Sequence, residues 1–202
     1  MHLNRFKPSS FAEATSAGLE IEPGLSLIPV GSWILNEDAL IAQMAEWRQQ
    51  SMAMFFAQFD STAAKTRQYL TNASLGQDNR LLFMISDHDV LVGHIGISNA
   101  TDETAEIDNV MRGIKHQSSQ VMAKSLNRLS EWCFEELGLG WLTLKVSSIN
   151  DRAIALYEAC GFVNTESRAL KLVEAPELTQ LTECDDSESN VEQRCLIMTR
   201  SN

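Results

Sequence analysis

The chain has 202 residues, of which 44% are hydrophobic and 21% are charged, and this composition is typical of a soluble globular domain with a single core. Its formal net charge of −11 argues against binding to nucleic acid or to an anionic membrane; it would suit a cationic acceptor, but it more simply keeps a protein soluble. The four cysteines show no CxxC pair and no Cys/His metal spacing, so no metal is expected. No apolar run is long enough for a signal peptide or a membrane span, which predicts a cytoplasmic protein.

The N-terminal quarter predicts an arm, a strand and a helix. Residues 1–24 have weak periodicity and end in Pro-Gly, so we expect an arm or an added edge element before a domain that spans 25–202. Residues 25–30 (LSLIPV) indicate a first strand, whose proline favours an edge or a bulge. Apolar residues at helical spacing then predict an amphipathic helix: Leu40, Ile41, Met44 and Trp47.

A segment rich in Met and Phe precedes a predicted hairpin. Residues 52–59 (MAMFFAQF) form either a second helix or a loop that faces the substrate, with core packing as the simpler role. A helix is expected over 61–70. Residues 81–86 and 90–99 are apolar runs joined by a short polar turn, which predicts two hairpin strands.

The stretch from 105 to 137 predicts a strand, a polar loop and a long helix. Residues 105–112 (AEIDNVMR) indicate the strand, and residues 113–120 (GIKHQSSQ) indicate the loop. Apolar residues at spacings of three and four predict the helix over 121–137. A helix start offers free backbone N–H groups and the positive end of the helix dipole. The junction could therefore cradle an anion, although most such junctions bind nothing.

Residues 147–163 (SSINDRAIALYEACGFV) are the most informative stretch of the chain. They follow an expected strand over 141–147 and predict a short helix opening at Asp151 or Arg152, where an acid can cap the helix or meet its positive end. Gly161 stands where helices commonly end in a left-handed residue, and a further strand begins after it.

The pattern Asn-x-Arg-Ala-x-x-Leu-Tyr-x-x-x-Gly-Phe in this stretch resembles the acyl-CoA signature of the GNAT superfamily of N-acetyltransferases. The resemblance covers roughly residues 25–173 and is specific from 105 to 163. It implies an α/β fold with a mixed, mostly antiparallel sheet flanked by helices. The sheet would splay between the strands at 105–112 and 141–147, where acetyl-CoA would enter as acyl donor.

The resemblance also implies which residues hold the donor. The family loop usually reads Gln/Arg-x-x-Gly-x-Gly/Ala. The residues expected to bind the donor here are those of the matching run: Gln117, Ser118, Ser119, Gln120, Val121 and Met122. Only Gln117 agrees with the family pattern, because Gln120 and Met122 stand where the family has small residues. Glycines let the backbone approach a pyrophosphate closely, so their loss leaves room for a weak binder. The pantetheine arm would contact the main chain of three strand residues: Val110, Met111 and Arg112. Asn150 would steady the splayed junction or bind the arm, and Arg152 could reach phosphate, although solvent exposure is the commoner fate of such an arginine.

Acetyl transfer to an amine needs a neutral nitrogen, a polarised carbonyl and a proton donor for the leaving thiolate. The family transfers the group directly in a ternary complex, so positioning outweighs any single side chain. Resemblance implies that Tyr157 protonates the CoA sulfur. Glu106 is the candidate base, with Asp108 as its substitute or as an amine-binding carboxylate; solvent-facing roles for both acids, or a water chain, remain open. Strand alternation puts both acids on one face with Val110, unless a bulge changes the register after Asp108. Lys145 stands where some peptide-acetylating members carry a glutamate.

The C-terminal part predicts an extended segment over 162–173, an acidic hairpin insertion over 174–193 and a last strand over 194–200. The insertion could cover the acceptor site or form a homodimer contact; a solvated loop is the simpler assumption.

The sequence thus predicts acetyl-CoA-dependent N-acetylation of a primary amine, without nucleic-acid or membrane partners. The acceptor stays open among an amino sugar, another small amine and a protein N-terminus. Trp47-Arg48 and Ser61-Thr62 resemble the branch that acetylates ribosomal proteins, whereas Asp108–Gly113 resembles members that act on amino sugars. The alternative is a noncatalytic acyl-CoA-binding or regulatory protein on the same fold, which the missing loop glycines favour.

Overall fold

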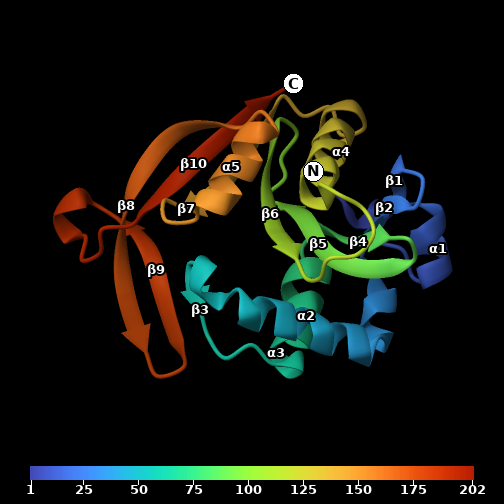
Figure 1. Ribbon diagram of the computed structural model, residues 1–202, viewed down its shortest axis with the longest axis horizontal. Helices are drawn as coiled ribbons and strands as arrows, with labels where there is room; N and C mark the ends of the chain where they lie inside the picture. Colours follow the sequence, from blue (N-terminus) through green and yellow to red (C-terminus); the bar gives the residue numbers. More distant parts are fainter.

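One ten-stranded sheet runs through the chain, which the computed structural model describes from residue 1 to residue 202 (Figure 1). The spatial order is β1-β2-β4-β5-β6-β7-β10-β8-β9-β3, and all neighbours are antiparallel except the parallel pair β6–β7. The strands are β1 (Leu19–Glu22), β2 (Leu25–Pro29), β3 (Ala57–Gln58), β4 (Leu81–Asp87), β5 (Val90–Ser98), β6 (Thr104–Arg112), β7 (Trp141–Ser147), β8 (Val163–Ala175), β9 (Leu178–Cys184) and β10 (Arg194–Ser201).

Helices cover both faces of this sheet, with α4 and α5 on one side and α2 and α3 on the other (Figure 1). The α-helices are α1 (Phe11–Ser16), α2 (Asp38–Gln50), α3 (Ala63–Tyr69), α4 (Val121–Glu135) and α5 (Asp151–Ala159). Short 3-10 helices occupy Asn4–Phe6, Ser32–Asn36, Met52–Met54 and Asp186–Glu188, and a π-helical turn continues α3 over Leu70–Leu75. No helix combines the length and the apolarity that a membrane crossing requires. The predicted mixed, mostly antiparallel sheet flanked by helices is therefore confirmed.

Each helical layer rests on its own hydrophobic core. The predicted stripe of α4 is buried against β4–β7, with Leu126, Leu129 and Cys133 fully enclosed. On the opposite face α2 buries Ile41, Met44 and Trp47 against β2 and β4. This division matters for function because β6 contributes side chains to both layers.

The N-terminal residues contribute the edge of the sheet. The first 24 residues include α1 and β1, and β1 pairs with β2 through Leu19 and Glu20. Leu3 and Ala14 are fully buried, because the segment lies against the main core and the α2 core respectively.

The Met- and Phe-rich segment is neither a regular helix nor a free loop. It forms the 3-10 turn Met52–Met54 followed by β3, which pairs with β9 through Ala57↔Gln180 and Gln58↔Thr179. The segment thereby connects the helical layer of α2 and α3 to the hairpin of β8 and β9.

Both predicted hairpins are present. β4 and β5 pair along their length around a turn in which His88 and Asp89 have positive φ. The acidic insertion at 174–193 contains β9, which pairs with the long β8 from Ala169↔Cys184 to Ala175↔Leu178. Leu181 of β9 packs with Leu170 of β8 and Cys195 of β10 in a small third core.

Candidate active site

The sheet opens between β6 and β7. These two strands pair only through Thr104–Glu106 and Trp141–Thr143, whereas β7 stays paired with β10 along its whole length. From Ile107 to Arg112 the side of β6 that faces β7 therefore has no strand partner, although its other side pairs with β5. The predicted splay is confirmed, and it leaves a strand edge to which an extended molecule can hydrogen-bond.

A β-bulge at Asn109 re-aims the side chains of β6 at the opening. Asn109 has a φ of 51°, and the register with β5 shifts between His94 and Gly96. Beyond the bulge, Val110 packs in the α4 layer and Met111 in the α2 layer. Of the two registers that the sequence left open, the structure has the one with a bulge after Asp108, and the inserted residue puts Val110 on the face opposite to Glu106 and Asp108.

A buried histidine fixes the carbonyl of the bulge. Nδ1 of His94 lies 2.7 Å from the main-chain oxygen of Asn109, and since a carbonyl only accepts, Nδ1 is the donor. Burial lowers the pKa of His94 to about 4, so the ring is neutral near pH 7 and its Nε2 carries a lone pair. The side-chain amide nitrogen of Asn109 (Nδ2) in turn donates to the Tyr69 hydroxyl at 2.8 Å. Both backbone and side chain of the bulge are thus held in place.

Asp108 is engaged in an ion pair. Its Oδ2 lies 2.8 Å from Nη1 of Arg80, and less than a fifth of either side chain is exposed. Burial raises the pKa of Asp108, and the attraction to Arg80 opposes this. The same Arg80 nitrogen donates to the Tyr69 hydroxyl at 3.0 Å, so Asp108 belongs to the support of the bulge.

Glu106 lies in the paired part of the strand. It stands opposite Thr143 of β7, is partly exposed, and accepts a hydrogen bond from the Asn99 amide at 3.0 Å. Glu106 is therefore the β6 acid that no cation neutralises by direct contact.

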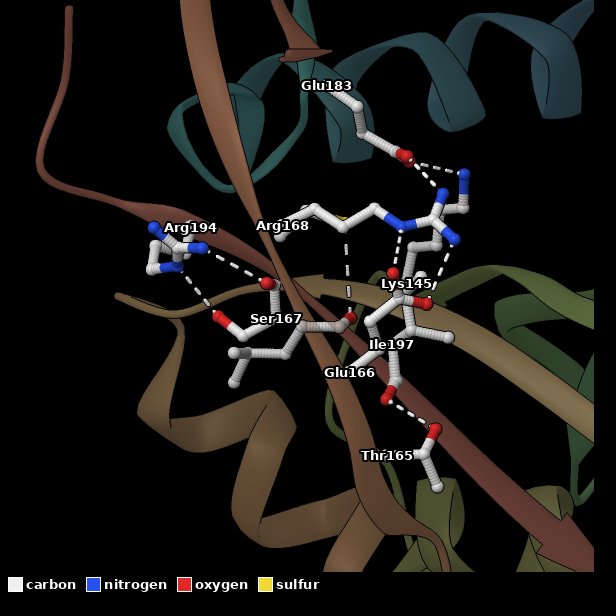
Figure 2. Close-up of polar contacts among 10 residues, drawn as sticks. Lys145, Thr165, Glu166, Ser167, Arg168, Glu183, Arg194 and Ile197 are labelled. Atoms are coloured by element: carbon white, nitrogen blue, oxygen red, sulfur yellow. Dashed lines mark hydrogen bonds and ion pairs between the residues drawn. The ribbon is translucent and has the colours of Figure 1, made fainter. Parts of the chain in front are cut away.

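Lys145 on β7 belongs to an ion network that crosses β7, β8 and β9 (Figure 2). Its Nζ lies 2.5 Å from Glu183, whose other oxygen binds Arg168 at 2.5 Å, and Arg168 also binds Glu166 at 2.7 Å. The hydrogen bond that Lys145 donates to Glu183 raises the pKa of Lys145. Lys145 is thus a fixed cation rather than a proton acceptor.

Tyr157 sits on α5 with only 7% of its surface exposed and its ring 6.3 Å from that of Phe162. Burial, with a smaller effect of Cys160, raises its pKa to about 12, so the phenol keeps its proton at neutral pH. The start of α5 is capped by the side chain of Asn150, which accepts from the Ala153 amide at 3.2 Å, and Arg152 is exposed. Asn150 therefore orders the helix that carries Tyr157.

The loop before α4 has a left-handed backbone conformation, which glycine favours, at a residue that is not glycine. Gln120 precedes α4 with φ 54° and ψ 27°, the left-handed conformation, and no side chain caps the first amides of the helix. Val121 and Met122 are buried in the core beneath α4. The two replacements of the family's small residues are thus accommodated by an αL backbone and by a side chain that faces the core.

Sequence reasoning missed the residue that anchors this loop. Asp87, at the end of β4, accepts hydrogen bonds from the Ser118 amide at 2.9 Å, the Ser118 hydroxyl at 2.7 Å and His88 Nδ1 at 2.8 Å. Burial opposes its ionisation, but these hydrogen bonds outweigh burial and lower its pKa to about 2. Of the loop residues predicted to face a phosphate, Ser118 is bound to a carboxylate, while Gln117 and Ser119 are exposed. An acid within a predicted hairpin turn carried no signal of this long-range contact.

A cavity of about 190 Å³ lies between α2, α3 and the bulge of β6. It is lined by Met44, Arg48, Phe55, Phe59, Lys65, Thr66, Tyr69, His94, Asn109 and Met111. Two of these, Phe55 and Phe59, come from the segment that the sequence offered as a substrate-facing wall. Neither of the β6 acids, Glu106 and Asp108, lines it. The cavity meets the strand edge at Asn109 and Met111, where the sheet opens.

Comparison with known proteins identifies the family and supports the fold. The family model described as acetyltransferase (GNAT) domain matches residues 35–163, whereas no curated protein matches the chain. Among solved structures, the RimL ribosomal L7/L12 alpha-N-protein acetyltransferase in complex with coenzyme A is similar with a TM-score of 0.68 and 12% identity, over 91% of this chain and 97% of that one. The spermidine N-acetyltransferase from Vibrio cholerae in complex with CoA and spermine has a TM-score of 0.65 and 18% identity, over 89% and 96% of the two chains.

The family match spans well over half of the chain and includes both the opened strands and the helix with Tyr157. The chain therefore belongs to the GNAT family of N-acetyltransferases.

Proposed function

We propose that the protein transfers an acetyl group directly from acetyl-CoA to a primary amine bound in the cavity between α2, α3 and β6. The observation that carries this proposal is the parting of β6 from β7 beside that cavity. Direct transfer requires that both reactants lie together, and a strand edge that borders a cavity supports such a ternary arrangement.

The residues at the opening fit the donor. Backbone groups of Val110, Met111 and Arg112 are available for the pantetheine arm, since this stretch of β6 has no partner on the β7 side. Free amides at the start of α4, after Gln120, are available for the pyrophosphate. When bound, acetyl-CoA supplies the acetyl group as an activated thioester.

Tyr157 is assigned the role of proton donor to the leaving sulfur. Its pKa, raised to about 12, keeps the hydroxyl protonated at neutral pH, so it can donate to a developing thiolate. Glu106 is assigned the role of base, because Asp108 is held by Arg80 and Lys145 by Glu183. Since Glu106 does not line the cavity, it would take the proton through water.

The similar structures act on two kinds of amine, a protein N-terminus and spermidine. We assign this chain an acceptor within the wider class of small amines, amino sugars and peptide N-termini.

Release of free CoA thiol from acetyl-CoA, measured over a panel of such amines, tests the activity. We expect turnover with at least one amine, and Tyr157→Phe should lower kcat by about 10²-fold while CoA binding stays nearly unchanged, because only the proton donor is lost. Glu106→Gln should lower kcat/KM by roughly tenfold or more, because the base is lost while the shape of the side chain is kept.

Asp151→Asn is the matched control, since Asp151 is an exposed first-turn residue of the same helix. CoA binding without turnover on any amine would replace the proposal with a noncatalytic acyl-CoA-binding protein. Failure of the protein to bind CoA would contradict both the enzymatic proposal and the noncatalytic alternative.

A further inference from the structure

The cavity beside the bulge carries positive charge in a protein whose formal net charge is −11. Arg48 from α2 and Lys65 from α3 line it, and none of its lining residues is an aspartate or a glutamate. The overall acidity of the chain therefore does not extend to this cavity.

The two cations are fixed by aromatic rings. The Arg48 guanidinium carbon lies 4.1 Å from the ring centre of Phe55 and 4.8 Å from that of Phe59, and the Lys65 ammonium lies 5.6 Å from Phe59. Such contacts position a cation without neutralising its charge. The charges thus remain available to a ligand.

Arg48 also has an unused donor. Its Nη2 donates to the carbonyl of Ala57 at 3.1 Å, but its Nε is buried and has no hydrogen-bond partner. A buried donor without a partner costs free energy, which an anionic acceptor group would recover. Asp108 of β6 does not supply that group, because it does not line the cavity and forms no hydrogen bond or ion pair with Arg48.

The lining that comes from β5 and β6 differs in chemistry from the lining that comes from α2 and α3. His94 is neutral, and its Nδ1 is occupied by the bulge carbonyl, so its Nε2 can only accept a hydrogen bond. An amine is a donor and suits this wall, next to the opened edge of β6, whereas an anion suits the wall of Arg48 and Lys65.

We propose that the acceptor is an amine that carries an anionic group, such as a carboxylate, at its other end, and that polyamines are disfavoured. This inference rests on the proposed function and narrows it to a substrate class. The anionic end binds between Arg48 and Lys65, the apolar body packs on Phe55 and Phe59, and the amine reaches Asn109 and His94.

Three amines of equal length test the inference: 5-aminopentanoate, 5-aminopentan-1-ol and 1,5-diaminopentane. We expect kcat/KM to fall by about tenfold from the carboxylate to the alcohol, since one charge-assisted hydrogen bond corresponds to about that factor. It should fall further for the diamine, because Arg48 and Lys65 repel its second ammonium group. Lys65→Glu should reverse the order of the first and last amines. Lys171→Glu, an equal charge change at an exposed position of β8 outside the cavity, should leave the order unchanged.

Calorimetric binding of the same amines, with and without CoA, separates this inference from the activity. If no amine is acetylated, the enzymatic proposal fails, and the order of affinities still decides the acceptor class. The inference is overturned if the diamine binds or reacts as well as the aminopentanoate, if none of the three binds, or if both lysine variants behave alike.

Discussion

Gln120 adopts a backbone conformation that favours glycine, although its own side chain makes that conformation unfavourable. A non-glycine residue in the left-handed region costs about 1–2 kcal/mol, yet Gln120 adopts φ 54° at the position where the family pattern has glycine. The first amides of α4 point into the loop only if this turn is made. The strain is therefore tied to the shape of the proposed phosphate site.

Replacing this residue by the family's choice should relieve the strain. Gln120→Gly is expected to raise the free energy of unfolding by roughly 0.5–1 kcal/mol, since the relieved strain exceeds the extra chain entropy of glycine. The affinity for CoA should rise as well, because the side chain no longer borders the amides. Thermal denaturation and calorimetric titration with CoA measure the two effects.

Gln117→Gly is the control, because Gln117 is exposed in the same loop and has no positive φ. It should destabilise slightly or have no effect. A lower Tm for Gln120→Gly than for the control would contradict the strain argument.

At the scale of elements, the loop between β6 and α4 is held by the end of a different hairpin. Asp87 of β4 is fully buried and binds Ser118 through both its amide and its hydroxyl. Hydrogen bonds to a charged group contribute about 1.5–3 kcal/mol each, more than ordinary loop contacts. Asp87 therefore acts as a positioning residue for the helix start.

Loss of one of these bonds should loosen the loop. Ser118→Ala removes the hydroxyl donor and keeps the amide bond, and we expect it to weaken CoA binding about 3- to 10-fold, since 1.4 kcal/mol corresponds to tenfold. Ser119→Ala removes the same hydroxyl group from the adjacent residue, which is exposed, and it should leave the affinity for CoA unchanged. Equal affinities of the two variants for CoA would contradict the role of Asp87 as a positioning residue.

At the scale of the whole molecule, the sheet consists of two parts that share a short seam. The pairs between Thr104–Glu106 and Trp141–Thr143 join β1, β2, β4, β5 and β6 to the C-terminal strands, and β3 adds a second link through β9 (Figure 1). A bound donor that pairs with β6 would extend the seam across the opening.

Hydrogen exchange can detect this extension. On addition of CoA, amides within residues 107–112 and at the start of α4 should exchange at least several-fold more slowly, because exposed backbone donors gain partners. Amides of β4, which already pair on both sides, should not change. Uniform slowing over the whole sheet would indicate general stabilisation instead of binding at the opening.

Much of the fold could be predicted from local patterns. The α4 stripe, the hairpin of β4 and β5 and the turn at Gly161, which has a φ of 81°, follow from periodicity and turn chemistry. The segment at 52–59 could not be predicted, because its short strand β3 exists only through pairing with β9, more than 120 residues later.

The candidate site divides in the same way. Tyr157 and the loop before α4 could be proposed because each lies within a continuous motif, and the splay of the strands followed from the family resemblance that these motifs carry. The ion pair of Asp108 with Arg80, the support of the bulge by His94 and the Asp87–Ser118 contact were not found, since each joins residues at least 15 positions apart.

The sequence by itself determined the family, and it named candidates for the donor-binding loop and the proton donor, because these depend on residues that are neighbours along one strand, turn or helix. Only the tertiary structure decided which acid remains free and which charge faces the acceptor. Net charge adds up all residues alike, whereas the field inside a cavity depends on the few side chains that the fold turns toward it, here Arg48 and Lys65.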